Sequence, residues 1–499
     1  MSSHGNEIVS VKKTLGDRMT RPNIIFILLD DFGWRDLGCY GSGFYETSNM
    51  DALCAQSMRF TDAYASCPVC SPTRASVLTG RYPARVGITN FIDWVGRSHP
   101  ARGRLIDVPY LKELPQTETS IAQALRDGGY ATWHVGKWHL GGPGFYPQEH
   151  GFEENVGGCE VGSPGSSGYF SPWSSIPALA DTDVPEGTYL TDYLTDRVLG
   201  LIASRDPGRP FFLNLCYYTV HTPIQAKAEK IAKYEARIRE LGLDRVDTFE
   251  EGDFFPCAHR KERRIRRRLV QSDPVYAAMV ESMDENVGRI LQTLKAEGIA
   301  DETVVVFTSD NGGLATSEGS PTCNAPLAEG KGWMYEGGTR EPLLVNWPGA
   351  TAPGSVCGVP VTSTDFYPTF LEMAGLDPMP EQHCDGVSLA PLLKGAGGLD
   401  REAIFWHYPH YGNQGGTPGS SVRAGNYKLI EFFEDSHVEL YHLRDDIGED
   451  RDLADELPAV TARLSRLLAD WRESIEARIP QPNPDFTPWR EREISGRRR

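Results

Sequence analysis

The stretch NIIFILLDD, residues 23–31, decides the fold class. Its first seven residues form an almost continuous apolar run rich in Ile, which predicts a strand buried on both faces of a parallel sheet. Two carboxylates, Asp30 and Asp31, follow directly. The carboxyl ends of parallel strands are where open α/β sheets place their ligand sites, so this strand predicts both an architecture and a site.

Strand and helix signals alternate along the chain on either side of this run. Strands are expected at residues 130–135, 211–215, 304–310 and 343–345, and helices at residues 48–57, 71–79, 119–127, 190–204 and 274–296. This alternation predicts an α/β sandwich with a central, mostly parallel sheet.

The pattern changes after about residue 386. Short segments such as AIFWHY, YKLIEFF and VELYHL are typical of antiparallel strands, and a helical stretch follows at residues 458–477. We therefore expect a larger domain over residues 20–385 and a smaller α+β C-terminal domain, with an antiparallel sheet, over residues 386–499.

Composition limits the class of protein and its partners. The net charge is -18, which argues against a general nucleic-acid binder. The N-terminal residues contain no apolar stretch of signal-peptide length, and NIIFILL is too short to cross a membrane. We expect a cytoplasmic protein without a membrane partner, or a periplasmic or secreted one if a leader has been removed. The ten cysteines are then expected to be free thiols.

The segment CPVCSPTRASVLTGRYPARVG, residues 67–87, is the richest in chemistry. Its C-x-x-C could be redox-active or half of a zinc site, although the chain has no second C-x-x-C. Cys70 with Arg74 could also be a thiolate nucleophile beside an anion-binding guanidinium. Pro72 suits the first turn of a helix, so residue 70 is expected at a helix N-terminus, which favours an anion.

The whole pattern adds a third interpretation. C-S-P-T-R at residues 70–74, continuing to L-T-G-R at residues 78–81, resembles the signature of the formylglycine-dependent type I sulfatases of the alkaline phosphatase superfamily. The resemblance implies an alkaline-phosphatase-like fold. It also implies that Cys70 is oxidised to formylglycine by a formylglycine-generating or anaerobic sulfatase-maturing enzyme. Of the two hydroxyls of the hydrated aldehyde, one would attack sulfur and the other would later expel sulfate.

Acidic strand ends predict a metal site. Asp30 and Asp31 end one strand, and Asp310 and Asn311 end another, and such a set of carboxylates needs a cation when buried. All-oxygen ligands suit Ca²⁺ or Mg²⁺ better than zinc. The resemblance implies a divalent ion held by these four residues and by the modified Cys70, and we expect Ca²⁺, with Mg²⁺ as the alternative.

Short segments elsewhere supply further polar groups that match the family: GKWHLG, VHTP and EGKGW. The resemblance implies that Lys137 and Lys331 bind sulfate oxygens, and that Arg74 adds positive charge nearby. His139 would position formylglycine, and His221 would protonate the leaving alcohol as a general acid, because an alkoxide leaves poorly.

Two probable loops could form walls of a substrate groove. Residues 91–104 and 405–421 mix aromatic and hydrogen-bonding side chains that suit sugars, and packing roles are an equal alternative for them. The candidates are Asp93, Trp94, His99, His407, His410 and Asn413. The Gly- and Pro-rich stretch at residues 141–187 is expected to face the same pocket as the second loop.

The sequence is similar to bacterial carbohydrate sulfatases that act on sulfated galactose or N-acetylgalactosamine, which implies a small sulfated saccharide as substrate. The alternatives are a phosphatase or phosphonate monoester hydrolase of the same fold, and an inactive glycan-binding homologue. The basic run KERRIRRR at residues 261–268 is interpreted as a solvated helix face rather than a binding patch. The oligomeric state is left open.

Overall fold

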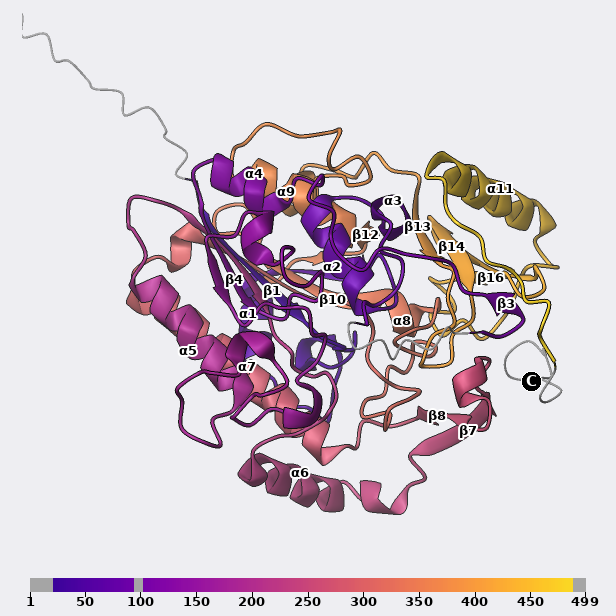
Figure 1. The fold of residues 1–499 in the computed structure, drawn as a ribbon, viewed down its shortest axis with the longest axis horizontal. Helices are drawn as coiled ribbons and strands as arrows, with labels where there is room; N and C mark the ends of the chain where they lie inside the picture. The colour runs from indigo at the N-terminus through magenta and orange to yellow at the C-terminus, as the bar shows by residue number, and fades with distance from the viewer. Residues whose placement is uncertain (1–20, 94–101, 488–499) are drawn as a thin grey trace, which may run out of the picture.

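A central mixed sheet organises the molecule, for which the computed structural model describes residues 21–93 and 102–487 (Figure 1). Its strand order is β11-β2-β10-β9-β1-β6-β4-β5, and β12 also pairs with β2. The strands are β1 Asn23–Leu29, β2 Met58–Tyr64, β4 Ala131–Gly136, β5 Glu154–Val156, β6 Phe211–Cys216, β9 Thr303–Ser309, β10 Arg340–Asn346, β11 Val356–Cys357 and β12 Val361–Thr362. β1 pairs in parallel with both β6 and β9, and β4 pairs in parallel with β6, which confirms a mostly parallel centre.

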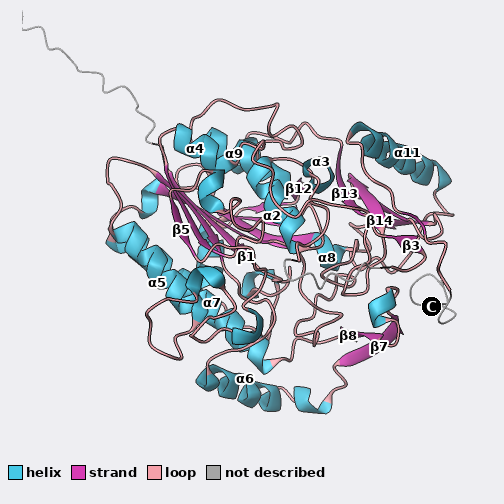
Figure 2. Cartoon of the chain, in the orientation of Figure 1, coloured by secondary structure: helices cyan, strands magenta, loops and turns pink. Residues whose placement is uncertain are grey.

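Helices cover both faces of this sheet (Figure 2). They are α1 Ser48–Gln56, α2 Cys70–Thr79, α3 Pro83–Val86, α4 Ile121–Asp127, α5 Leu190–Ala203, α6 Ala228–Glu240, α7 Pro274–Ala296, α8 Glu336–Thr339, α9 Phe366–Met373, α10 Ala390–Leu393 and α11 Pro458–Ser474. Ile25, Ile27 and Leu29 of β1 share a core with α5 and α7, whereas the even-numbered residues of β1 share a core with α2, α4 and α9. β1 is apolar on both sides because each side meets a helical layer.

A smaller antiparallel sheet forms the C-terminal part of the chain. Its order is β13-β14-β15-β16, with β13 Ala403–Tyr408, β14 Gly419–Ala424, β15 Tyr427–Phe432 and β16 Val438–His442. Leu464 and Leu468 of α11 pack on this sheet against Val422, Leu429 and Leu440. The predicted α+β architecture of this region is confirmed, while the domain boundary at residue 385 stays a prediction.

The structure adds the direction of one expected strand and corrects two expectations about secondary structure. β10 runs antiparallel to β9, because the chain stays at the carboxyl end of β9 through residues 310–339 and then runs back. Residues 405–421 are not one loop: β13 and β14 take both ends of this segment. The basic run contains strand β8 (Arg264–Arg268), which pairs with β7 (Phe249–Phe254), and Ile265 is buried between exposed arginines with the period of two of a strand.

Two further strands, β3 (Leu105–Ile106) and β17 (Gln481–Pro482), pair with each other and connect residues 481–482 to the segment between α3 and α4. Within residues 21–93 and 102–487, no helix combines the length and the apolar composition needed to span a membrane.

Candidate active site

Four acidic and amide side chains meet where β1 and β9 end. The register pairs Leu29 with Ser309, so the residues that follow each strand lie side by side. The amide N–H of Asp31 donates to Asp310 Oδ1 at 3.3 Å, and Asn311 Nδ2 donates to Asp31 Oδ1 at 2.9 Å. These residues and Asp30 are at most 1% exposed. The structure thus brings the expected ligand set into one buried cluster.

Each carboxylate of this cluster faces a cation. Lys137 Nζ lies 2.7 Å from Asp30 Oδ2, and Lys331 Nζ lies 2.7 Å from Asp31 Oδ1. The guanidinium of Arg74 donates two bonds to Asp310 Oδ2, at 2.7 and 2.9 Å, and a third to the carbonyl of Lys137. Pairing of this kind offsets the cost of burying charge, and it draws residues from five separate segments into one place.

Residue 70 begins helix α2, as the sequence predicts. Cys70 Sγ lies 3.4 Å from His139 Nδ1, and the hydroxyl of Ser71 lies 3.2 Å from the same nitrogen. His139 Nε2 donates to the carbonyl of Ile92 at 2.6 Å, so Nδ1 is the acceptor. The side chain of residue 70 is therefore in contact with His139 Nδ1, and its backbone forms the first residue of α2.

Burial raises the pKa of the Cys70 thiol above its ordinary value, with Lys137 and Lys331 opposing that shift. An unmodified thiol at this position is therefore mostly protonated at neutral pH and is a weak nucleophile. Cys67 is also a buried free thiol whose pKa burial raises, which disfavours a redox-active C-x-x-C.

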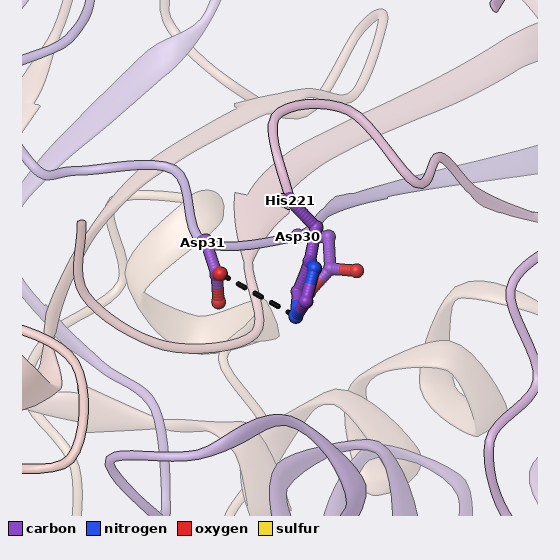
Figure 3. Close-up of side chains that lie close together, drawn as sticks. All are labelled: Asp30, Asp31 and His221. Atoms are coloured by element: carbon purple, nitrogen blue, oxygen red, sulfur yellow. Dashed lines mark ion pairs between the residues drawn. The ribbon is translucent and has the colours of Figure 1, made fainter. Parts of the chain in front are cut away.

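His221, in the loop after β6, points toward Asp31 and is less buried than that carboxylate (Figure 3). Its Nδ1 donates to the carbonyl of Thr222 at 2.8 Å, and its Nε2 accepts from Lys331 Nζ at 3.2 Å. The same Nε2 is 3.7 Å from Asp31 Oδ2. Burial, and then the charge of Lys331, lower the pKa of His221 to about 4, so the ring is neutral at pH 7.

The backbone at two of these residues is unusual in a way that the sequence did not reveal. Asp31 has φ 62° and His139 has φ 60°, in the left-handed region that non-glycine residues seldom adopt. Such conformations persist where the surrounding contacts fix them, and they gather at functional sites.

Two buried oxygen atoms of the cluster are available to bind a cation. Asp30 Oδ1 and Asn311 Oδ1 are buried and accept no hydrogen bond from the part of the chain that the structure describes. Ligand atoms of Asp30, Asp31 and His221 lie within 4.8 Å of one another. Burial raises the pKa of Asp30 to about 8, even beside Lys137, so a further positive charge would hold this carboxylate ionised. The oxygen-rich donor set fits a hard divalent cation.

Two of the expected substrate residues, His407 and His410, are packed inside the protein. His410 is fully buried, with Nε2 beside the hydroxyl of Thr89 and Nδ1 on Asp107. His407 is bonded to Ser420 and to the carbonyl of Arg478. Both rings have protein partners at both nitrogens, which is a packing role. Asp93 is half-buried, and Trp94 and His99 lie outside the described residues.

The loop between β13 and β14 does approach the site, through residues that the sequence analysis missed. Gln414 Nε2 donates to Glu318 Oε1 at 2.9 Å, and the hydroxyl of Thr222, next to His221, lies 3.4 Å from Glu318 Oε2. Asn413, a sequence candidate, bonds His259 at 2.8 Å. No local motif marked Glu318 or Gln414, because their importance comes only from tertiary contact.

The stretch of residues 141–187 borders the other side. The hydroxyl of Tyr169 donates to the carbonyls of Tyr218 and His221, at 2.6 and 2.8 Å. A Cβ placed on Gly162 would meet the ring of His139 at 2.4 Å. Residues 141–187 therefore contact the backbone of His221 and the ring of His139, whereas the β13–β14 loop reaches this region only through Glu318, and a pocket shared by both loops stays a prediction.

The segment that carries Lys331 is packed backbone to backbone. A Cβ on Gly312 would meet the carbonyl oxygen of Gly337 at 1.8 Å, and one on Gly338 would meet that of Trp333 at 2.0 Å. The amide of Gly332 donates to the carbonyl of Pro68 at 2.8 Å, which ties the Lys331 segment to the segment before residue 70.

Comparison with known proteins agrees with this arrangement. A family model described as Sulfatase matches residues 22–376, and one described as N-sulphoglucosamine sulphohydrolase, C-terminal, matches residues 329–474. A protein named Sulfatase from Formosa agariphila is 32% identical over 91% of this chain and 88% of its own. Human N-acetylgalactosamine-6-sulfatase is 29% identical over 94% of this chain and 88% of its own. The crystal structure of Ps i-CgsB in complex with k-i-k-neocarrahexaose superposes with a TM-score of 0.72 at 28% identity, and the match covers 94% of this chain and 95% of that one.

Proposed function

Because the chain belongs to the sulfatase family, and is a sulfuric ester hydrolase, we propose that it removes sulfate from a sulfated saccharide through a formylglycine made from Cys70. One observation carries this proposal. Residue 70 begins a helix inside a buried cluster that contains Arg74, Lys137, His139, His221 and Lys331.

The nucleophile would be formylglycine at position 70, and a maturing enzyme of the formylglycine-generating or anaerobic type would produce it. Its hydrate supplies the hydroxyl that attacks sulfur. His139 orients this side chain from Nδ1, because its Nε2 is committed to the carbonyl of Ile92. The first turn of α2 adds unpaired backbone N–H groups, which stabilise negative charge at this position.

A divalent ion, Ca²⁺ in preference to Mg²⁺, would be held by Asp30, Asp31, Asp310, Asn311 and the modified residue 70. When bound, it supplies positive charge that stabilises the anionic sulfate group and the attacking oxygen. The buried oxygens of Asp30 and Asn311 that accept no hydrogen bond support this assignment. Arg74 donates to Asp310 and to the carbonyl of Lys137, so it would orient a ligand carboxylate and add positive charge beside it.

Lys137 and Lys331 would bind sulfate oxygens. Both ammonium groups are buried within the cluster, and Lys331 Nζ also contacts His221 at 3.2 Å. Buried cations stabilise developing charge more strongly than exposed ones, because little solvent screens them.

His221 would protonate the leaving alcohol from Nε2. In the free protein, Nδ1 holds the ring proton against the carbonyl of Thr222, and Nε2 accepts from Lys331. The acid form is the imidazolium, in which Nε2 carries the proton that passes to the departing oxygen while Nδ1 keeps its bond to the carbonyl of Thr222.

The saccharide assignment draws on the relatives. Human N-acetylgalactosamine-6-sulfatase and the neocarrahexaose complex of Ps i-CgsB support a sulfated galactose or N-acetylgalactosamine. The loops that touch the site, around Tyr169 and Gln414, carry polar and aromatic groups suited to such a substrate.

The test compares paired sulfate and phosphate esters of the same alcohol, together with the mass of the tryptic peptide of residues 60–74. We expect turnover of the sulfate ester and a peptide mass that shows an aldehyde in place of the thiol. Faster turnover of the phosphate or phosphonate ester would favour a phosphatase or phosphonate hydrolase. Saccharide binding without any turnover, from a protein whose peptide carries formylglycine, would favour a glycan-binding homologue.

A further inference from the structure

The hairpin of β7 and β8 is a basic projection on an acidic protein. Residues 249–268, which span both strands and their connection, contain seven Lys or Arg and four acidic side chains, and all seven basic ones lie in residues 260–268, whereas the whole chain has a net charge of -18. Figure 1 shows the hairpin at the margin of the molecule, between α6 and the C-terminal sheet. The reaction at residue 70 requires none of these arginines.

The base of the hairpin is fixed to the rim of the active site. Arg268 donates its backbone N–H to the carbonyl of Ala315 at 2.9 Å, and Arg260 Nη1 donates to the hydroxyl of Ser317 at 2.7 Å. Glu318, next in the chain, lies against Thr222, which adjoins His221. The hairpin is therefore connected to the loop of His221 through Ser317, Glu318 and Thr222.

Its outer arginines are exposed and held in place. Arg264 stacks over the ring of Phe254 at 4.4 Å and Arg266 over that of Phe249 at 3.7 Å, both measured to the ring centroid. Arg263 is exposed beside them. Among the described residues these three guanidinium groups make no ion pair within 4.0 Å, although Glu251 lies opposite Arg266 in the strand register. A stacked guanidinium loses little freedom when it binds an anion, because the ring already limits its motion.

We propose that Arg263, Arg264 and Arg266 bind a second anionic group, a sulfate or a carboxylate, on the saccharide whose sulfate ester is hydrolysed. The proposal rests on the proposed function and deepens it: the preferred substrate is an oligosaccharide with more than one anionic group. A polyanion that enters the acidic protein's site needs a local positive surface, and the arginines of the hairpin supply one on the side of the site where Ser317 and Glu318 connect to Thr222.

The first experiment measures kcat/KM for nitrophenyl sulfate and for two oligosaccharides of equal length, one monosulfated and one multiply sulfated. The variant is Arg263→Gln/Arg264→Gln/Arg266→Gln. A matched control, Arg444→Gln/Arg451→Gln/Arg466→Gln, removes three exposed arginines from the C-terminal region. We expect the hairpin variant to lose about tenfold or more on the multiply sulfated substrate, mainly through KM, and less than about twofold on the other two.

Salt gives a second readout. For the wild type, raising NaCl from about 0.01 M to about 0.1 M shortens the Debye length from about 30 Å to about 10 Å. This change should lower kcat/KM only for the multiply sulfated substrate. The hairpin variant should show little of this dependence. Equal losses in the hairpin and control variants, or equal losses on all three substrates, would overturn the proposal.

Calorimetric binding to the Cys70→Ala protein separates this proposal from the proposed function. If the wild type turned over no sulfate ester, the function would fail, yet tighter binding of the multiply sulfated oligosaccharide, lost in the hairpin variant, would still support the hairpin site. If a DNA oligonucleotide bound as tightly and depended on the same arginines, the hairpin would be a general polyanion surface and the saccharide assignment would be wrong.

Discussion

Removing the ammonium of Lys428 should lower the stability of the protein far more than removing that of an exposed lysine in a salt bridge, although Lys428 lies outside the central sheet. Lys428 lies on β15 and is fully buried, with Nζ 2.9 Å from Glu336 Oε1 and 3.0 Å from Glu449 Oε1. Glu336 begins α8, which directly follows the segment that carries Lys331. Burial alone would raise the pKa of Glu336, but Lys428 and Arg340 hold it below its ordinary value.

In Lys428→Met, two buried carboxylates lose a shared cation. Breaking a buried pair by removing one partner costs about 3–5 kcal/mol. With an unfolding entropy of about 2.1 cal/mol/K per residue, a chain of 499 residues has about 1 kcal/mol/K, so the Tm should fall by about 3–5 °C. The difference in Tm between Lys428→Met and the wild type should become smaller as the pH falls below 4.5, the ordinary pKa of glutamate. A carboxyl with a depressed folded pKa contributes stability above its unfolded pKa and loses it as the pH falls toward the folded pKa.

Thermal unfolding followed by circular dichroism measures this, with Lys394→Met as the control. Lys394 Nζ is also 2.9 Å from a carboxylate, that of Glu372, but the two side chains are 45% and 41% exposed. An exposed pair is worth about 0–1 kcal/mol, so the control should shift the Tm by less than about 1 °C. Equal shifts in the two variants would refute the claim that burial, rather than distance, sets the value of these pairs.

Three other outcomes are expected. Cys70→Ala should abolish turnover of nitrophenyl sulfate while the Tm changes little, and near wild-type activity would exclude residue 70 as nucleophile. Asp310→Ala should lose both activity and a bound divalent ion, measured by elemental analysis; full activity without metal would contradict the site. His221→Ala should be impaired about 10²–10⁴-fold on a sugar sulfate and far less on nitrophenyl sulfate, whose phenolate leaves unaided. Equal losses on both esters would place His221 on the sulfate rather than on the leaving group.

Local pattern was enough to predict the elements that build the sheet. The Ile-rich run at residues 23–29 is β1, and the amphipathic stretch at residues 274–296 is α7, because burial on a strand or on one helix face leaves a periodic trace in the sequence. The meeting of Asp30 with Asp310 also follows from pattern, since parallel neighbours end at one edge.

Tertiary contacts decided what the pattern could not. A short apolar run such as residues 343–345 predicts a strand but carries no direction, so the antiparallel course of β10 was not foreseen. The sequence makes His410 a candidate for sugar binding, but both of its ring nitrogens are hydrogen-bonded to Asp107 and Thr89, which lie some 300 positions earlier in the chain. The basic run at residues 261–268 predicts a helix face from its charge, but it lies on strand β8, because charge alone does not distinguish the period of a helix from that of a strand.

The close backbone packing around Lys331 limits which single substitutions the protein tolerates. Any side chain at Gly312, Gly337 or Gly338 would overlap a carbonyl oxygen that belongs to a neighbouring turn and has no freedom to rotate away. In a saturation library selected for activity, these positions should keep glycine almost alone. New substrate preferences should instead arise at the exposed side chains of β8, Arg264 and Arg266, which can change without displacing the backbone behind the reacting groups.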